Sequence, residues 1–316
     1  MSILEFFISC DWGTSNFRLR VVHFKTLKII EEIKTDQGIK KIFNNFKIQN
    51  EYNQLDFFSN YLIRQIQLLP IKYQNYIIIS SGMVSSSIGL YELDYAKMPF
   101  SAKGDSLNMK YLKLNNRVEL LLISGIKNDC GMMRGEETQA IGLQKHLSED
   151  TEGILLLPGT HSKHLGFKNG IFIGLKSFMT GELFEILSQK SILSNSIIED
   201  VKNDISECPF LEGVKLGSQG KLSSSLFTVR ANDLFGKSTK NDNYFFLSGL
   251  LIGDELAYLK KENKRVFLAA PYPLINLYQI ALNYLLGSDN YVVFNEDIVE
   301  KALLIGQKKI LELYDK

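Results

Sequence analysis

The opening of the chain has the hydrophobic pattern of three successive strands. Residues 3–10 form a short apolar run, which is typical of a buried strand, and residues 17–24 alternate between apolar and polar side chains. Residues 27–33 give a third strand, and Asp-Trp-Gly-Thr-Ser at 11–15 interrupts the apolar pattern after the first. The pattern predicts strand, glycine-containing loop, strand, turn and strand.

The same order of elements returns in the middle of the chain. Strands are expected at residues 153–157, 163–167 and 171–178, with Pro-Gly-Thr-His-Ser after the first and an Asn-Gly turn before the third. Gly159 thus occupies the place of Gly13, 146 positions earlier. An internal repeat at about half the chain length predicts two lobes of one design.

The remaining periodicity predicts mainly helices. The expected helices span residues 54–69, 181–189, 249–262, 273–286 and 296–314. Further strands are expected at residues 77–79, 120–124 and 266–269, and residues 195–243 have the least regular pattern. The alternation of strands and helices predicts an α/β protein.

Length and charge limit the classes of protein. The chain has 316 residues, more than one core usually serves, which favours two domains. A net charge of +1 gives no indication of nucleic acid or an anionic membrane as partner. The cysteines, Cys10, Cys130 and Cys208, contain no CxxC pair, so we expect neither a disulfide framework nor a zinc site.

The amino-terminal segment and the cysteines together favour the cytoplasm. The first ten residues are apolar, but they carry Glu5 and no basic leader, which indicates a strand and not a signal peptide. No apolar run approaches the length of a membrane span. Free cysteines suit a reducing compartment.

The first glycine loop has the groups that bind phosphate. Gly13 lets the backbone approach an anion, and successive N–H groups with the Thr14 and Ser15 hydroxyls can hold phosphate oxygens. Asp11 is placed to hold Mg²⁺ through water. The alternative is an ordinary hairpin turn with a capping aspartate. No Walker A sequence is present, which excludes a P-loop kinase.

The second loop repeats the glycine but not the aspartate. Gly159 and Thr160 are the expected phosphate contacts, whereas Leu157 stands where Asp11 stands in the first loop. Lys163 can neutralise phosphate charge instead. His161 can donate to phosphate or substrate, or it is an ordinary polar loop residue.

The two loops resemble those of the actin-like ATPase and sugar kinase superfamily, in which they hold one triphosphate from opposite lobes. In sugar kinases of this superfamily an acidic residue at a helix start takes the proton of the attacking hydroxyl. Glu136 matches that place, and the helix dipole would keep it ionised. The alternative is that Glu136 and Glu137 are ordinary first-turn helix acids, and the choice of base between them stays open.

Six segments in order resemble the 2-dehydro-3-deoxygalactonokinase family. They are DWGTSNFR (11–18), SGMV (81–84), MRGEETQ (133–139), LPGTHSK (157–163), FMTGELF (178–184) and LSGLLIG (247–253). The resemblance implies transfer of the ATP γ-phosphate to the 6-hydroxyl of 2-dehydro-3-deoxy-D-galactonate, with ATP and Mg²⁺ as cofactors, in galactonate breakdown. It also implies that the missing second-loop aspartate is a family trait.

Three departures from the family pattern leave the sugar acid and its epimer open. Ala269-Ala270-Pro271 stands where the family usually has a glycine followed by Ala-Pro, and His164 stands where it often has tryptophan. Residues 91–100 are only loosely similar.

The carboxylate of a sugar acid favours an arginine partner. Arg18 and Arg134 are the candidates, and a structural ion pair is the alternative for each. Glu182 would bind sugar hydroxyls or merely cap its helix. The other expected substrate contacts are Asn16, Ser81, Gly82 and Met83. Ser248, Gly249 and Ala270 are expected on the adenosine side, with close packing of the Gly249 helix against the sheet as the favoured alternative.

We therefore expect a two-lobed actin-like ATPase (ribonuclease H-like) fold with an interlobe cleft. Residues 1–125 would form the first lobe, joined by the C-terminal helix 296–316, and residues 126–295 the second. The partner would be a small-molecule sugar acid, and the oligomeric state stays open between monomer and homodimer. Other functions on the same fold are a kinase of a related sugar acid, a phosphoanhydride hydrolase and a non-catalytic sensor.

Overall fold

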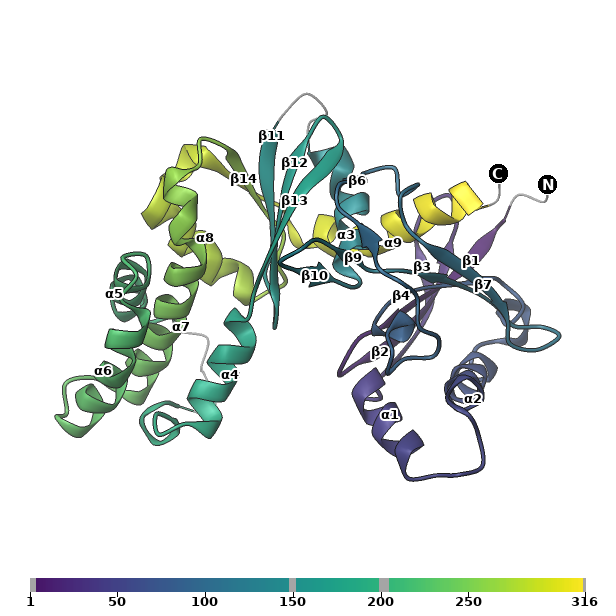
Figure 1. The fold of residues 1–316 in the computed structure, drawn as a ribbon, viewed down its shortest axis with the longest axis horizontal. Coiled ribbons are helices and arrows are strands. Elements are labelled where there is room, and N and C mark those ends of the chain that lie inside the picture. Colours follow the sequence, from purple (N-terminus) through teal and green to yellow (C-terminus); the bar gives the residue numbers. More distant parts are fainter. Residues whose placement is uncertain (1–3, 148–151, 199–204, 315–316) are drawn as a thin grey trace. The chain divides into compact units, whose positions relative to one another are not determined.

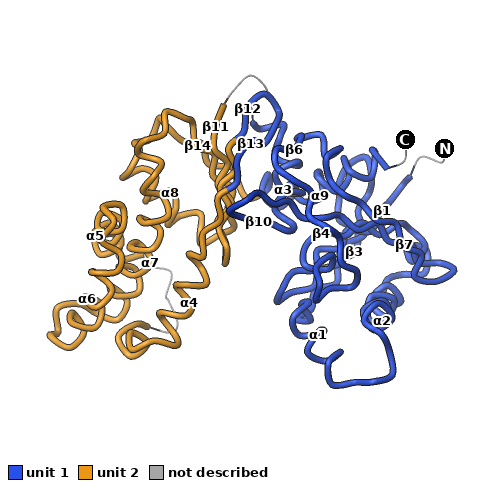
Figure 2. The backbone as a smooth tube through the Cα atoms, in the orientation of Figure 1, with its two compact units in different colours: residues 1–151, 167–175, 297–316 blue, residues 152–166, 176–296 orange. Residues whose placement is uncertain are grey.

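The chain is a mixed α/β protein with two compact units. The structure, a computed structural model, describes residues 4–147, 152–198 and 205–314 (Figure 1). Unit 1 comprises residues 1–151, 167–175 and 297–316, and unit 2 comprises residues 152–166 and 176–296 (Figure 2). The predicted α/β class is confirmed. The lobe boundary at residue 125 and the cleft stay predictions.

Unit 1 is built on a six-stranded sheet of order β3-β2-β1-β4-β8-β7. Its strands are β1 (Phe6–Trp12), β2 (Phe17–His23), β3 (Ile29–Thr35), β4 (Ile78–Gly82), β7 (Met109–Lys113) and β8 (Glu119–Ile123). β1, β2 and β3 pair antiparallel, as the meander predicted, whereas β1, β4 and β8 run parallel. The predicted first strand began at Ile3, which lies outside the described residues.

Apolar side chains of this sheet form the core with two helices. α1 (Ile39–Lys47) and α2 (Gln54–Gln67) follow the meander, and α2 lies where helical spacing predicted it. Trp12, Phe17, Phe58 and Leu62 are fully or almost fully buried in one cluster. The first loop is therefore attached to the apolar core of unit 1.

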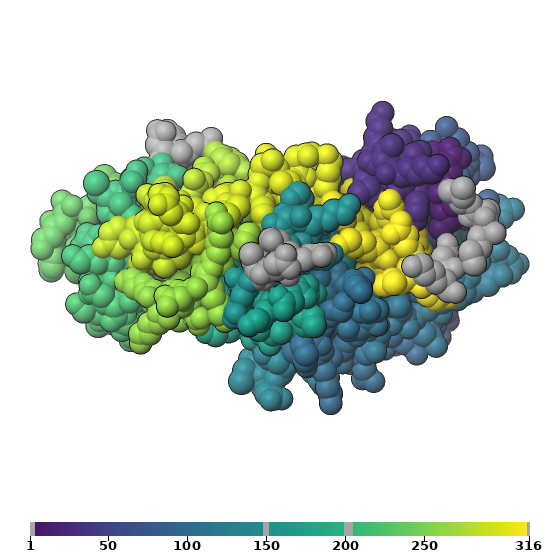
Figure 3. Space-filling model, turned by 90° about the horizontal axis from the view of Figure 1, so that it is seen from above, coloured from purple at the N-terminus to yellow at the C-terminus, as the bar shows by residue number. Residues whose placement is uncertain are grey.

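A second group of helices lies behind the end of β1. α9 (Glu296–Tyr314) packs against α3 (Glu136–Leu143), and a Cβ at Gly306 would collide with the Thr138 carbonyl. The Gln307 amide donates to the Cys10 carbonyl and to Ser81 Oγ, both at 3.3 Å. Side chains of α9, drawn in yellow, are visible beside the purple N-terminal segment in Figure 3. Thus α9 supports strands β1 and β4.

Several short elements complete unit 1. A three-stranded sheet of order β10-β9-β5 is formed by β5 (Ala96–Lys97), β9 (Ile126–Lys127) and β10 (Met132–Met133), and β6 (Phe100–Ser101) pairs with Ile171 and Phe172. The 3₁₀ helices here are η1 (Ile71–Tyr73), η2 (Met83–Ser85) and η3 (Gln144–His146). Strands of two residues have no readable period, so the sequence did not predict them.

Unit 2 repeats the meander. Its sheet has the order β15-β14-β11-β12-β13, with β11 (Glu152–Leu157), β12 (Ser162–Lys168), β13 (Ile171–Phe178), β14 (Arg265–Leu268) and β15 (Tyr291–Val293). Residues 167–168 of β12 and 171–175 of β13 belong to unit 1. Asn169 and Gly170 have φ angles of 52° and 72°, which confirms the predicted Asn-Gly turn.

The helices of unit 2 correct one prediction. They are α4 (Thr180–Lys190), α5 (Glu207–Gly217), α6 (Leu222–Leu234), α7 (Lys240–Leu256) and α8 (Leu274–Leu286), with η4 (Ser194–Ser196), η5 (Ala257–Lys261) and η6 (Ser288–Asn290). The prediction that residues 195–243 have the least regular structure is therefore wrong for 205–243, which contain α5, α6 and the start of α7. Residues 199–204 lie outside the described residues. α7 begins nine residues before the predicted 249, because Thr239 and Asp242 form a capping box.

Candidate active site

The first loop has hydrogen-bond donors exposed at its surface, and its ends are hydrogen-bonded to neighbouring backbone. The Trp12 indole donates to the Gln37 carbonyl at 3.0 Å, and Gly13 N–H donates to the Asn16 carbonyl at 3.0 Å. Thr14 and Ser15 are exposed, and their N–H groups donate no hydrogen bond to any residue that the structure describes. Two N–H groups and two hydroxyls therefore remain for an anion.

Hydrogen bonds from the N-terminus of α1 stabilise this loop. The N–H groups of Gly38, Ile39 and Lys40 donate to the carbonyls of Ser15, Gly13 and Thr14, at 3.2, 2.9 and 3.1 Å respectively. A Cβ at Gly38 would collide with the backbone of Thr14 and Ser15. The sequence reasoning missed Gly38, although a glycine between a strand and a helix start was a signal of close approach.

Asp11 ends β1 among other charged groups of unit 1. Its register partners are Arg18 on β2 and Ser81 on β4. Burial raises the pKa of the Asp11 carboxyl, Arg18 and Arg20 oppose that rise, and the charge of Glu136 adds to it. The structure therefore brings Glu136 close to Asp11 and Arg18, from which it is far apart in the sequence.

Two adjacent carboxylates at the start of α3 differ in access. Glu136 is half-buried and accepts a hydrogen bond from Arg134 N–H at 2.9 Å. Glu137 is fully buried, and its oxygens accept from Gly135 N–H at 2.8 and 2.9 Å. Burial, aided by the Glu136 charge, raises the pKa of Glu137 to about 7. Only Glu136 of this pair is open to a reacting group.

The two candidate arginines have different surroundings. The Arg134 guanidinium donates to the Ser85 carbonyl, to Ser85 Oγ at 2.7 Å and to the Leu93 carbonyl at 3.3 Å, and it lies 4.1 Å from the Tyr95 ring centre. Its position is explained by these contacts, none of which is an ion pair. The Arg18 side chain is 40% exposed, with Glu32 at 3.8 Å. Arg18 is thus the more accessible of the two.

The other first-lobe candidates differ in exposure. Ser81 is fully buried, and its hydroxyl accepts from Gln307. Gly82 is also buried, Met83 is half-buried and Asn16 is exposed. Only Asn16 and Met83 of this group have side chains that reach the surface of unit 1.

The second loop also has free donors. Thr160 and His161 are exposed, and across the described residues their N–H groups find no acceptor. Lys163 is 5% exposed, and its ammonium donates to the His161 carbonyl at 2.9 Å. Leu157 is buried, which agrees with its apolar character at the place of Asp11.

Helix α4 holds the second loop much as α1 holds the first. Glu182 N–H donates to the Thr160 carbonyl at 3.0 Å, and a Cβ at Gly181 would lie 2.6 Å from the Gly159 carbonyl oxygen. The Glu182 carboxylate also lies 2.6 Å from His161 Nε2. Glu182 therefore has a partner within the loop in this structure.

The residues expected beside adenosine are mostly inside unit 2. Ser248 and Ala270 are 7% and 1% exposed. A Cβ at Gly249 would collide with the Phe210 carbonyl, so α7 packs closely on α5 at this point. The packing interpretation of Gly249 is thus supported, with helix α5 and not the sheet as its partner.

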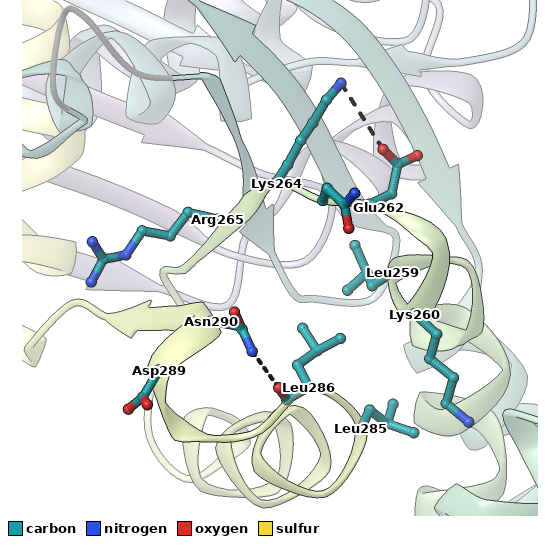
Figure 4. A pocket seen from close by; sticks show the side chains of 10 residues that line it. Leu259, Lys260, Glu262, Lys264, Arg265, Leu285, Leu286, Asp289 and Asn290 are labelled. Atoms are coloured by element: carbon teal, nitrogen blue, oxygen red, sulfur yellow. Dashed lines mark hydrogen bonds and ion pairs between the residues drawn. The ribbon is translucent and has the colours of Figure 1, made fainter.

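A pocket of about 490 Å³ in unit 2 contains none of these residues (Figure 4). Its lining includes Leu259, Lys264, Arg265 and Asp289. The Lys264 ammonium lies 4.0 Å from Glu262 and 2.7 Å from Glu152, so its charge is compensated within the protein.

The described residues contain neither a metal-binding cluster nor a helix that could span a membrane. Among the described residues, no three histidine, cysteine, aspartate or glutamate side chains gather as a metal site. The Asp11 carboxylate supplies a hard oxygen ligand of the kind that Mg²⁺ prefers. Within residues 4–147, 152–198 and 205–314, no helix has the length and apolarity that a membrane crossing requires.

Comparisons with known proteins agree on one family. A family model described as 2-keto-3-deoxy-galactonokinase matches residues 11–306. A protein of Rhizobium meliloti, provisionally named 2-dehydro-3-deoxygalactonokinase, is 26% identical over 263 residues, 81% of each chain. The 2-dehydro-3-deoxygalactonokinase of Escherichia coli is 25% identical over 259 residues, 80% of each chain.

A solved structure extends the similarity to the fold. A Sinorhizobium meliloti protein, provisionally assigned as a 2-dehydro-3-deoxygalactonokinase, superposes with a TM-score of 0.82 at 25% identity. The superposition covers 97% of this chain and 96% of that one. The likeness therefore includes both units.

Proposed function

Because the chain belongs to the 2-keto-3-deoxy-galactonokinase family, we propose that it phosphorylates 2-dehydro-3-deoxy-D-galactonate on its 6-hydroxyl with ATP. The product is 2-dehydro-3-deoxy-6-phospho-D-galactonate, an intermediate of galactonate breakdown. The family match across residues 11–306 is the observation that carries this proposal.

We assign the phosphates of ATP to the two loops. Gly13, Thr14 and Ser15 would hold them in unit 1, supported by the free N–H groups of Thr14 and Ser15. Gly159 and Thr160 would do so in unit 2. The Lys163 ammonium lies under the second loop and would compensate phosphate charge from there.

Mg²⁺ fits the proposal at Asp11. The carboxylate is a hard oxygen donor at a strand end, and Mg²⁺ usually keeps several waters while bound by one or two carboxylates and by phosphates. When bound, the ion would neutralise charge on the phosphates. Burial raises the pKa of Asp11 and the charges of Arg18 and Arg20 oppose that rise, and a bound cation would likewise favour the ionised carboxylate.

Glu136 is proposed as the general base. The 6-hydroxyl oxygen forms the new bond to the γ-phosphorus, and its proton passes to the Glu136 carboxylate. The bond between that phosphorus and the bridging oxygen breaks, and its electron pair stays on ADP. Glu136 is favoured over Glu137 because Glu137 is fully buried and engaged with Gly135 N–H.

Arg18 is proposed as the partner of the sugar-acid carboxylate. Its guanidinium is 40% exposed, and its one ion-pair contact, with Glu32, is 3.8 Å long. The proposal keeps the other expected positions. The substrate side comprises Asn16, Ser81, Gly82, Met83, Arg134 and Glu182, and the adenosine side Ser248, Gly249 and Ala270. Of these, the buried Ser81 and Gly249 and the half-buried Arg134 would act through the backbone or by packing.

The proposed setting is the cytoplasm, with a small-molecule sugar acid as partner. A homodimer is compatible with the proposal, and light scattering would distinguish it from a monomer.

The test is ADP release by the purified protein with Mg²⁺–ATP. Three samples are compared: 2-dehydro-3-deoxy-D-galactonate, its gluconate epimer and no sugar. We expect turnover that requires the galactonate derivative. Turnover of only the epimer would leave a kinase with another substrate, because one hydrogen bond can decide between such sugars. ADP release without sugar would overturn the proposal in favour of a hydrolase.

A further inference from the structure

A buried cluster of polar side chains lies behind the second loop and has no part in the proposed chemistry. At its centre the Glu255 carboxylate of α7 is 2% exposed. Thr180 Oγ1 and Tyr278 Oη donate to it, the latter at 2.7 Å, and His164 Nε2 lies 2.8 Å away. These three partners come from α4, α8 and β12, so the cluster joins four elements, including α7 itself. A carboxylate taken out of water needs such hydrogen-bond partners, and here three side chains supply them.

One arm of the cluster, formed by Tyr278 and Ser162, connects Glu255 to Gly159 at the start of the loop. A carboxylate only accepts, so the Tyr278 hydroxyl gives its one proton to Glu255. The hydroxyl of Ser162, 3.2 Å from Tyr278 Oη, must then donate to it. The Ser162 oxygen is left to accept from Gly159 N–H, at 3.4 Å. In this series of hydrogen bonds, each donor therefore lies on the Gly159 side and each acceptor on the Glu255 side.

Burial keeps this arm in its donating state. It raises the pKa of the Tyr278 phenol well above its usual range, with the charge of Glu255 adding to the rise. The phenol therefore retains its proton throughout the pH range in which the enzyme would work.

The other arm reaches the middle of the loop. Thr180 is the first residue of α4, and it is 8% exposed with its hydroxyl on Glu255. The next two residues touch the loop: Gly181 approaches the Gly159 carbonyl closely, and Glu182 N–H donates to the Thr160 carbonyl. Fixing Thr180 therefore fixes the helix end on which Thr160 rests.

We propose that Glu255 is a positioning residue for nucleotide binding, which sets the second phosphate loop through Tyr278–Ser162 on one side and Thr180 on the other. The inference rests on the proposed role of that loop. It explains why the carboxylate is buried where an apolar residue would be cheaper to bury. The free N–H groups of Thr160 and His161 then face the phosphate without rearrangement.

The test removes one hydroxyl from each of the two connections between Glu255 and the loop. Tyr278→Phe and Thr180→Val remove one hydroxyl each and keep the shape. We expect each to raise the Kd for Mg²⁺–ATP in calorimetry, and the KM for ATP, about five- to tenfold, the size of one hydrogen bond. The KM for the sugar acid should stay unchanged. Thr180→Ser, which keeps the hydroxyl, should restore the wild-type values.

Tyr258→Phe is the matched control. It is the same substitution, and it removes the hydroxyl 2.9 Å from His164 Nδ1, the ring nitrogen that does not face Glu255. Its Kd for ATP should equal that of the wild type, even if all three variants melt at lower temperature. Equal effects of Tyr258→Phe and Tyr278→Phe, or no effect of the arm variants, would overturn the proposal. A wild-type protein that binds no ATP would instead refute the proposed function.

Discussion

The two phosphate loops share their backbone design and differ in their chemistry. In each, a strand meander is followed by a helix whose first turn donates to the loop, with a glycine, Gly38 or Gly181, where the two meet. Beyond this likeness, the first loop follows the carboxylate Asp11, whereas the second follows the buried Leu157. In the proposed assignment, both loops therefore bind phosphate, whereas only the first follows a carboxylate.

What lies behind the loops differs as well. The first loop is anchored by the Trp12 indole, which packs edge-on against Phe17 at 5.0 Å in an apolar core. The second is backed by hydrogen bonds that end on Glu255. Apolar packing fixes shape alone, whereas a hydrogen-bonded chain also fixes the direction of each proton. We infer that equivalent loops can be held by different means.

The largest effect is expected at the acidic side of this comparison. Glu136→Gln keeps the shape of the side chain but removes the proton acceptor. We expect kcat to fall about 10²- to 10⁴-fold with little change in either KM, measured by ADP release. Glu312→Gln, on an exposed carboxylate of α9, should have wild-type kcat. A Glu136→Gln enzyme with wild-type kcat would remove Glu136 as the base.

The next effect separates the two loops directly. Asp11→Asn should lower kcat/KM about a hundredfold and raise the Mg²⁺ concentration needed for half-maximal rate, because the amide is a weaker ligand. Leu157→Asn places the same amide at the equivalent position of the second loop. We expect it to lower thermal stability without changing the Mg²⁺ requirement. An equal increase in the Mg²⁺ requirement of both variants would contradict the proposal that only the first loop follows a Mg²⁺-binding carboxylate.

The likeness between the loops has its own test. Gly38→Ala and Gly181→Ala each press a methyl group into a loop backbone, and we expect about tenfold weaker ATP binding in both. The strain should also destabilise each variant by about 1–3 kcal/mol, measured by thermal unfolding. Gly174→Ala, where no atom lies within 4 Å of the added carbon, is the control and should bind ATP normally. Normal ATP binding by Gly38→Ala or Gly181→Ala would contradict the proposal that each loop depends on close contact with a glycine at a helix start.

The last effect concerns the pH dependence of stability and the buried acid of unit 1. The pKa of Glu137 is raised to about 7 in the folded state, so the folded protein binds an extra proton between about pH 4.5 and 7. Stability from this group is present below that window and is lost as pH rises through 7, by on the order of 3 kcal/mol. Melting temperatures from pH 5 to 8 should fall in the wild type and fall less in Glu137→Gln. Parallel curves for the two proteins would show that Glu137 does not titrate in this window.

The sequence predicted those parts that have a clear period or a repeated motif. Both meanders, helix α9 and the Asn-Gly turn lie within a few residues of their predicted places. Asp11 and Glu136 were selected from separate motifs, and the structure brings their charges together. These successes depend on local pattern and on the repeat.

Features set by tertiary contact were not readable. Gly38 and the Glu255 cluster depend on which backbone lies opposite, and α6 carries serines at 223–225, which weaken its helical pattern. Arg134 has the right residue type for a carboxylate, yet its donors reach Ser85 and Leu93. Side-chain chemistry alone does not reveal which partner a group finds in the folded protein.

The central claim is that the γ-phosphate goes to a sugar oxygen and not to water. Phosphorus NMR of a reaction with Mg²⁺–ATP and 2-dehydro-3-deoxy-D-galactonate tests it directly. The account predicts a new phosphomonoester signal, split by the two protons on carbon 6, that grows as ATP is converted to ADP. Inorganic phosphate as the sole new product would contradict it.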